Sequence, residues 1–174
     1  MLSANIVRTN TNAAEGDPMT TRSELPIALR AAYLALHRRS EARFAPQGAT
    51  ADQFVLLATL ARGQALTQRE LARRMSSDPS TVRAMLVLLE QRGLVERGTH
   101  PTDARARTVA LTAKGERTFR QLWMAGEPIR AQMLAALQPG EAETLVQLLT
   151  RVAEVLNAVL VGGPTYSHSP EDES

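Results

Sequence analysis

The sequence lacks several kinds of residue and pattern, and each lack excludes a class of protein. It contains no cysteine, which excludes disulfides, thiolate zinc sites and thiol-based oxidation sensing. Its three histidines, His37, His100 and His168, lie far apart and lack the spacing of a metal site. No uncharged apolar run is long enough to span a bilayer, and no signal-peptide pattern opens the chain. The sequence therefore predicts a cytoplasmic protein that needs no metal, cofactor or membrane.

Aromatic residues are also few, at 3% of the 174 residues, although 44% of the residues are hydrophobic. A core of Leu, Ala and Val with few aromatic rings is typical of packed helices rather than of a β-sandwich or barrel. The formal net charge is only +2, but basic residues gather in the centre and acidic residues load the tail. The central basic residues are Arg62, Arg69, Arg73, Arg74, Arg83, Arg92, Arg97, Arg105, Arg107, Lys114, Arg117 and Arg120. This charge distribution is the pattern expected of a protein that binds DNA.

Capping and breaking residues divide the chain into six predicted helices. Residues 1–21 show no periodicity and predict a disordered N-terminal arm. The first helix is predicted to begin at Ser23, which can serve as its N-cap, with Pro26 in its first turn. Thr50 and Gln53 form a capping-box pattern, which predicts the start of a second helix.

The centre of the chain predicts two short helices joined by a tight turn. Thr67 and Glu70 form another capping box, which opens a helix that runs through Met75. Asp78 can cap the next helix, which is predicted to end at Gly93. A short helix, a tight turn and a second helix that opens on small hydroxyl residues suit insertion into the major groove of DNA.

A basic hairpin follows these two helices. Residues 94–97 and 107–111 alternate like paired strands, and turn-forming residues join them. Thr112 can then cap a long fifth helix. Gly126 and Pro128 are expected to kink that helix, because proline removes a backbone donor and crowds the preceding turn.

The last helix, which begins after Pro139 and Gly140, carries a continuous apolar stripe from Leu145 to Leu160. Such a stripe is too apolar to leave in water, and a twofold dimer would cover it. Packing within one chain is the alternative for part of the stripe. Residues 162–174 are polar and acidic, and predict a disordered tail.

The fourth helix has two faces of different chemistry. Its predicted inward face consists of Val82, Met85, Leu86 and Leu89. Ser80, Thr81 and Arg83 lie on other faces in its first turns, where short hydroxyls allow close approach to DNA and an arginine can pair with guanine. The alternative is an ordinary amphipathic helix with a solvated arginine. The adjoining basic hairpin favours DNA.

Three segments of the chain carry a resemblance to a known family: TQRELARRM at 67–75, STVRAMLVLLEQRGLVER at 80–97 and HPTDARARTVALTAKG at 100–115. With them, residues 50–160 resemble the MarR family of winged-helix transcriptional regulators. The last segment is the most specific, because the family's wing carries an Asp-x-Arg pair before a Val-x-Leu-Thr-x-x-Gly junction. Here these residues are Asp103, Arg105, Val109, Leu111, Thr112 and Gly115.

The resemblance implies a mainly α fold with a small β-hairpin wing, divided into functional parts. Residues 22–161 would form one domain, with a winged helix-turn-helix at 50–112 and dimerisation helices at 22–45 and 113–161. It also implies that the arginine at position 105 enters the minor groove while the aspartate at 103 orients it, as a narrow, electronegative groove favours; a surface salt bridge is the alternative. The candidate DNA-binding residues are Thr67, Gln68, Ser77, Ser80, Thr81, Arg83, Asp103, Arg105 and Arg107. The candidate dimerisation residues are Leu25, Leu29, Leu145, Leu149, Val152, Leu156 and Val159.

Members of the family often bind small aromatic or lipophilic ligands where the dimerisation helices meet the winged helix. The resemblance therefore suggests a ligand site, for which the candidates are Tyr33, His37, Phe54, Leu57 and Met85. A Tyr and a His one turn apart could supply polar anchors in an apolar pocket. The alternative is that these are ordinary core and surface residues.

The sequence departs from the family pattern at Val87 and Leu88, where many relatives carry charged residues. Either these two side chains are buried against another element or they line a cavity. Burial is the favoured prediction.

The function expected from these features is a homodimeric, ligand-responsive repressor that binds a palindromic operator in double-stranded DNA. The alternative is a winged-helix module that binds a small molecule or a protein and no longer reads DNA. An enzyme is not expected, because no nucleophile with a base, paired carboxylate site, phosphate loop or metal set can be assembled from the sequence.

Overall fold

The structure, a computed structural model, describes residues 18–62, 65–99 and 106–161. The chain divides into two compact units, one up to Arg38 and one from Arg39 onward. The elements are α1 (Pro18–Phe44), a 3₁₀ turn η1 (Ala45–Gln47), α2 (Ala51–Leu60), β1 (Leu66–Thr67), α3 (Gln68–Arg74), α4 (Pro79–Gln91), β2 (Val95–Thr99), β3 (Arg107–Leu111), α5 (Ala113–Ala125), α6 (Glu127–Ala135) and α7 (Glu141–Val161). The predicted mainly helical fold with a β-hairpin is confirmed.

The predicted caps lie where the helices of the central region begin. Thr50 Oγ1 accepts a hydrogen bond from Gln53 N at 3.1 Å, and Gln53 Oε1 accepts from Thr50 N at 3.3 Å. Thr112 Oγ1 accepts from Gly115 N at 3.0 Å. Each cap satisfies backbone donors that a helix N-terminus would otherwise leave unpaired, which explains why the sequence pattern located these helix starts.

The first helix differs from its prediction at the N-terminal end. It begins at Pro18, so Ser23 lies inside the helix and is not its N-cap, and Pro26 is an interior residue rather than part of the first turn. Proline suits the first position of a helix because its missing N–H would be unsatisfied there in any case. The predicted arm therefore loses residues 18–21 to this helix, and its remainder, like residues 162–174, lies outside the described residues.

A small antiparallel sheet has the strand order β1-β3-β2. The predicted hairpin is confirmed, with Val95 opposite Leu111 and Thr99 opposite Arg107. The third strand, β1, was not predicted; it pairs Leu66 with Val109. Two residues are too few to show the alternation that identifies a strand.

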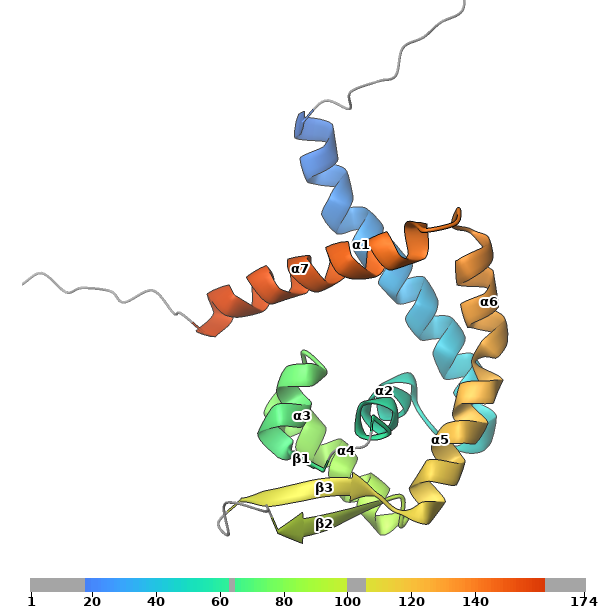
Figure 1. Ribbon diagram of the computed structural model, residues 1–174, viewed down its shortest axis with the longest axis vertical. Helices are drawn as coiled ribbons and strands as arrows, with labels where there is room; N and C mark the ends of the chain where they lie inside the picture. The colour runs from blue at the N-terminus through green and yellow to red at the C-terminus, as the bar shows by residue number, and fades with distance from the viewer. Residues whose placement is uncertain (1–17, 63–64, 100–105, 162–174) are drawn as a thin grey trace, which may run out of the picture. The chain divides into compact units, whose positions relative to one another are not determined.

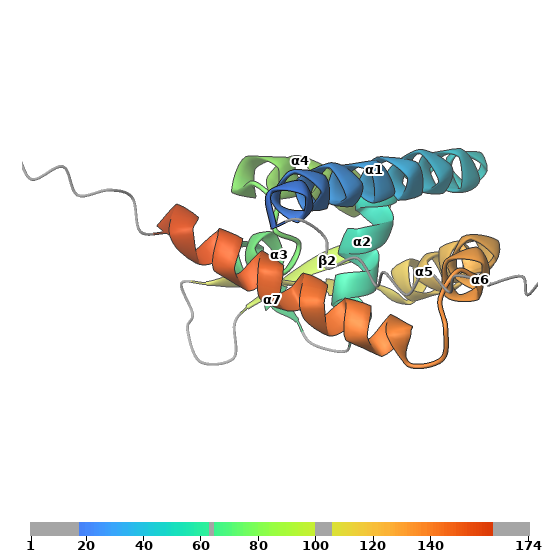
Figure 2. The ribbon, with the colours of Figure 1, turned by 90° about the horizontal axis from the view of Figure 1, so that it is seen from above.

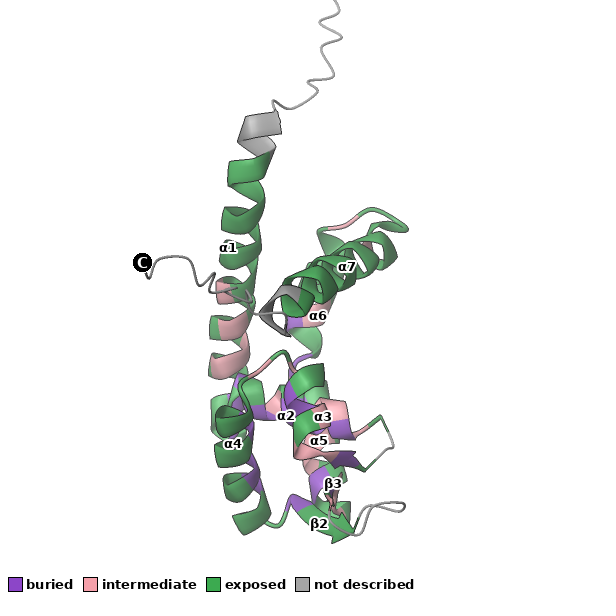
Figure 3. Ribbon diagram, turned by 90° about the vertical axis from the view of Figure 1, so that its left-hand side faces the viewer, coloured by how far each residue is buried: buried purple, intermediate pink, exposed green. Residues whose placement is uncertain are grey.

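The hydrophobic core lies among α2, α3, α4 and the sheet. Figure 1 and Figure 2 show these helices gathered beside the strands. The largest fully buried side chains are Phe44, Leu56, Leu57, Leu71, Val82, Leu86, Leu89 and Leu122. Figure 3 shows the buried side of α4 turned toward this core and its other side exposed. The core therefore fixes the orientation of α4.

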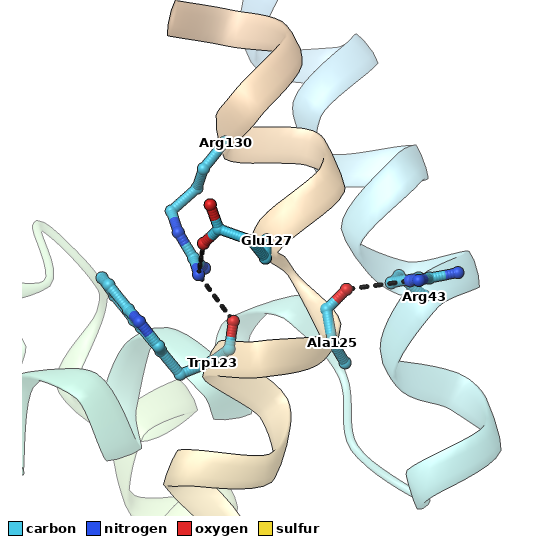
Figure 4. A network of polar contacts seen from close by, with 5 residues as sticks. All are labelled: Arg43, Trp123, Ala125, Glu127 and Arg130. Atoms are coloured by element: carbon cyan, nitrogen blue, oxygen red, sulfur yellow. Dashed lines mark hydrogen bonds and ion pairs between the residues drawn. The ribbon is translucent and has the colours of Figure 1, made fainter.

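The predicted kink near Gly126 is a complete break. Helix α5 ends at Ala125 and α6 begins at Glu127, with Pro128 in its first turn. Two arginine side chains bind the carbonyl groups at the end of α5, as Figure 4 shows: Arg43 Nε donates to Ala125 O at 2.8 Å, and Arg130 donates to Trp123 O at 2.7 Å. Cationic side chains at these carbonyls satisfy the C-terminal end of the helix.

Candidate nucleic-acid interface

Hydrogen bonds fix the start of α3, the turn after it and the start of α4. Thr67 N and Oγ1 both donate to Glu70 Oε2 at 2.7 Å, and Thr67 Oγ1 accepts from Glu70 N at 3.2 Å. Gln68 Nε2 donates to Pro79 O at 3.2 Å and so joins the start of α3 to the start of α4. Ser77 N donates to Ala72 O at 3.0 Å. The half-buried Thr67, Gln68 and Ser77 thus lie in the framework that positions α4.

Asp78 caps α4 and also binds a side chain at its surface. Its carboxylate accepts from Ser80 N at 2.9 Å and from Thr81 N at 3.1 Å, and it accepts the Ser80 hydroxyl proton as well. The hydrogen bonds from the Ser80 hydroxyl and then from the Thr81 backbone hold the pKa of Asp78 below its ordinary value. Because the Ser80 proton is directed at Asp78, the hydroxyl oxygen is left to act as an acceptor toward a further partner.

The first turns of α4 present the three residues predicted to read DNA. Ser80, Thr81 and Arg83 are all exposed. The inward face is fully buried, as predicted, and includes Val82 and Leu86. A rigid inner face therefore supports an outer face with one hydroxyl acceptor, a second hydroxyl and a guanidinium.

The prediction that Val87 and Leu88 are buried is wrong. They are 40% and 50% exposed, respectively. The physical reason is helical periodicity: the inner face of α4 is already formed by other residues, and these two positions project from the outer face one turn after Arg83 and Ala84. They line a shallow hollow on the surface, not an enclosed cavity.

The β2–β3 hairpin, called the wing below, is joined to the C-terminal half of α4. Arg97 Nε contacts Glu90 Oε2 at 2.9 Å, an ion pair between β2 and α4. Arg107 is exposed and lies opposite Thr99, at the outer end of the described hairpin. Asp103 and Arg105 lie outside the described residues. The exposed arginines on α3, α4 and the wing are Arg69, Arg73, Arg74, Arg83, Arg97 and Arg107.

Comparison with known proteins identifies the family. A MarR family model matches residues 49–106. Transcriptional regulator HosA of Escherichia coli O111:H- is 31% identical over 103 residues, which are 59% of this chain and 76% of HosA. The chain belongs to the MarR family. HTH-type transcriptional repressor MdtR of Bacillus subtilis is 27% identical over 132 residues, which are 76% of this chain and 85% of MdtR. Among solved structures, a mutant of MarR from E. coli complexed with operator DNA matches with a TM-score of 0.66 and 27% identity, and the match covers 79% of this chain and 99% of that one.

The junction after the wing shows why the MarR-family motif in this chain ends on glycine. Thr112 N donates to Leu94 O at 3.1 Å, and Thr112 Oγ1 donates to Gly93 O at 2.7 Å. Gly115 is buried directly beneath the Leu94 carbonyl, where a Cβ atom would lie 1.9 Å from the oxygen. Only glycine allows α5 to approach the Leu94 carbonyl this closely.

The candidate ligand residues of this MarR-family protein fall into two groups. Tyr33 and His37 lie on α1 with their ring centroids 5.7 Å apart. Leu57 and Met85 are buried in the core, and Phe54 is partly buried against it. The ring centroids of Phe54 and Phe44 lie 4.8 Å apart, in an aromatic cluster that also contains Phe119 and Trp123. Tyr33 is exposed and His37 is half-buried, so only Phe54, Leu57 and Met85 have a packing role in the core. A ligand role for the five residues remains a prediction.

The apolar stripe on α7 is exposed. Every described side chain of α7 is exposed except that of Ala142, which is half-buried, and Figure 3 shows the described part of the helix as mostly exposed. The side chain of Val159 lies outside those described, and on α1 Leu25 and Leu29 are exposed. The exposed large apolar residues of α7 are Leu145, Val146, Leu148, Leu149, Val152, Val155 and Leu156.

Sequence reasoning missed two contacts that position this surface. One is the ion pair between Glu90 and Arg97, whose partners are seven residues apart across a turn and carry no helical spacing signal. The other is the Ser80 hydroxyl bond to Asp78. The sequence showed Asp78 as a cap, but the orientation of a hydroxyl follows only from the positions of both side chains.

Proposed function

We propose that this MarR-family protein is a homodimeric transcriptional repressor that binds a palindromic operator in double-stranded DNA through α4. The observation that carries the proposal is the outer face of α4, where Ser80, Thr81 and Arg83 are exposed on a helix whose opposite face is fully buried. The likeness to a MarR structure complexed with operator DNA supports the same use of the fold.

In this proposal the side chains on α4 have separate roles. The Arg83 guanidinium has only donors, so it suits the two acceptors on the major-groove edge of guanine. Ser80 offers an acceptor, which suits the amino group of cytosine or adenine. Arg107, with Asp103 and Arg105 at the wing, would follow the backbone and the neighbouring minor groove. Thr67, Gln68 and Ser77 would support α4 from the turn and contact phosphates.

The dimer is proposed on the apolar face of α7. Seven large apolar side chains there are between 37% and 65% exposed, more than a monomer in water ordinarily leaves uncovered in one stripe. A twofold axis would pair this face with its copy, together with Leu25 and Leu29 of α1. The two α4 helices would then enter successive major grooves, about 34–36 Å apart.

A small aromatic or lipophilic effector is the proposed signal for release. The residues proposed to contact it are Tyr33, His37, Phe54, Leu57 and Met85. Such an effector would act by binding better to a conformation in which the two α4 helices are wrongly spaced for DNA. Titration of aromatic carboxylates against the bound complex, followed by Trp123 fluorescence, tests this part. A panel that neither changes the fluorescence nor releases DNA would contradict it.

Selection of bound fragments from a genomic library tests DNA binding itself. The wild-type protein should recover a palindromic sequence, and Arg83→Ala should weaken its binding by about 1–3 kcal/mol per half-site and relax the preference at one position. Arg117→Ala, which removes an exposed arginine from α5 instead, is the matched control and should bind like wild type. If no sequence were enriched, the alternative of a small-molecule or protein-binding module would replace this proposal.

A further inference from the structure

The outer face of α4 continues beyond Arg83 as an apolar surface. Ser80, Arg83, Ala84, Val87, Leu88 and Gln91 line one shallow hollow. Their spacing of three and four residues places them on one side of the helix. The polar end of this hollow is the part already proposed to read DNA, and its apolar part is Ala84 with Val87 and Leu88.

A partner that accepts Ser80 and Arg83 must also meet these apolar side chains. Val87 follows Arg83 by one helical turn, and Leu88 follows Ala84 by one turn. From Ser80 to Gln91 the helix rises about 16 Å, so a major groove about 12 Å wide would enclose at least the first of these turns. Continuity with the proposed DNA-reading residues therefore identifies double-stranded DNA as the occupant of the hollow.

The major-groove edge of DNA offers one apolar group, the 5-methyl group of thymine. We propose that Ala84, Val87 and Leu88 read thymine methyl groups beside the base pairs contacted by Ser80 and Arg83. Val87 is the central contact, because it is the apolar side chain one turn from Arg83. This inference rests on the proposed function and adds to it a class of sequence: operators with thymine at defined positions in each half-site.

Replacement of thymine by deoxyuridine tests the inference, since it removes the methyl group and leaves base pairing and the major-groove hydrogen-bonding groups unchanged. The probe is the duplex that the full-length protein selects from a randomised pool, remade with deoxyuridine at each thymine in turn. At one or more positions in each half-site, wild-type affinity should fall about threefold to tenfold, as expected for a buried methyl group.

The variants Val87→Ala and Val87→Ala/Leu88→Ala should bind the thymine duplex more weakly and lose most of the discrimination against deoxyuridine. Val55→Ala is the matched control, because Val55 on α2 is 44% exposed, close to the 40% of Val87; it should discriminate as wild type does. Thermal unfolding should be similar for all three variants, since the altered side chains are exposed.

Three results would overturn the inference. Wild-type protein could bind the selected duplex equally well with thymine or deoxyuridine, or Val87→Ala/Leu88→Ala could keep the full discrimination. The double variant could also change the sedimentation of the protein and leave DNA binding intact, which would make the hollow a protein-contact surface. Failure of the proposed function is distinguishable, because the pool would then yield no selected duplex at all, and both proposals would fall.

Discussion

Replacing Gly115 with alanine tests how tightly the wing junction is built. The added Cβ would lie 1.9 Å from the Leu94 carbonyl oxygen, 2.9 Å from its carbonyl carbon and 3.3 Å from Leu111 Cδ2. The Leu94 carbonyl cannot easily move away, because it accepts from Thr112 N at 3.1 Å and leads into Val95, which is paired with Leu111. Alanine must therefore displace backbone rather than a flexible side chain.

The size of the effect follows from three contributions. Forcing an extra methyl group into a packed site costs about 1–3 kcal/mol. Weakening the hydrogen bond from Thr112 N to Leu94 O adds about 1 kcal/mol. The better helix propensity of alanine recovers at most about 1 kcal/mol. With the first contribution taken at its middle value, Gly115→Ala should therefore lower the free energy of unfolding by about 2 kcal/mol.

Urea unfolding followed by circular dichroism measures this change. Gly98→Ala is the control, because the added Cβ would meet a single side-chain atom, Thr108 Oγ1 at 3.2 Å, and no backbone atom. It should change the free energy of unfolding by less than about 0.5 kcal/mol. If Gly115→Ala unfolded within about 1 kcal/mol of wild type, the close approach of α5 to Leu94 would not hold.

Three further predictions concern the cap, the dimer and the wing. The pKa of Asp78 is lowered in the folded state, so its contribution to stability is present above the ordinary carboxylate pKa and is lost as the pH falls through the lower folded-state value. Asp78→Asn should therefore lose less stability than wild type as the pH falls below about 4. Parallel curves of unfolding free energy against pH for the two proteins would contradict this. Leu149→Lys with Leu156→Lys should give monomers or aggregates in sedimentation, whereas a wild-type monomer at micromolar concentration would contradict the dimer. Arg105→Ala should weaken DNA binding and reduce its salt dependence by about one phosphate equivalent; Asp103→Ala should also weaken binding, although it removes a negative charge, and tighter binding by a folded variant would refute the orienting role.

The helix starts in the centre of the chain were predictable because they depend on neighbouring residues. A capping box needs only a Thr and a Glu or Gln three residues later, and both Thr50 and Thr67 form one. Asp78 likewise forms the predicted cap through backbone groups within three residues. Both partners of such a contact lie within three residues of each other, so the contact can be predicted directly from the sequence.

The features that the sequence misjudged depend on distant residues or on weak local signals. β1 is a strand because Leu66 pairs with Val109 of β3, and a two-residue segment carries no sequence pattern that predicts such a pairing. The start of α1 was placed at Ser23 because serine is a good cap, but a proline at position 18 suits a first helical turn equally well. The exposure of Val87 was misjudged because hydrophobic character was taken to mean burial, although the helical period already placed this residue opposite the core.

The misjudged Val87 and the correctly predicted cap Asp78 belong to the same helix, and the two faces of that helix explain how α4 can combine stability with recognition. Four apolar side chains on the inner face hold the helix to the core, so the outer face is free of any packing requirement. Along that outer face the chemistry changes from an acceptor at Ser80, through the donors of Arg83, to the apolar surface of Val87. The edges of base pairs in the major groove carry the complementary three kinds of group. A change on this face should therefore alter which DNA is bound and leave the free energy of unfolding nearly unchanged. A change at Val82 or Leu86 should instead lower the free energy of unfolding and leave the preferred DNA sequence nearly unchanged.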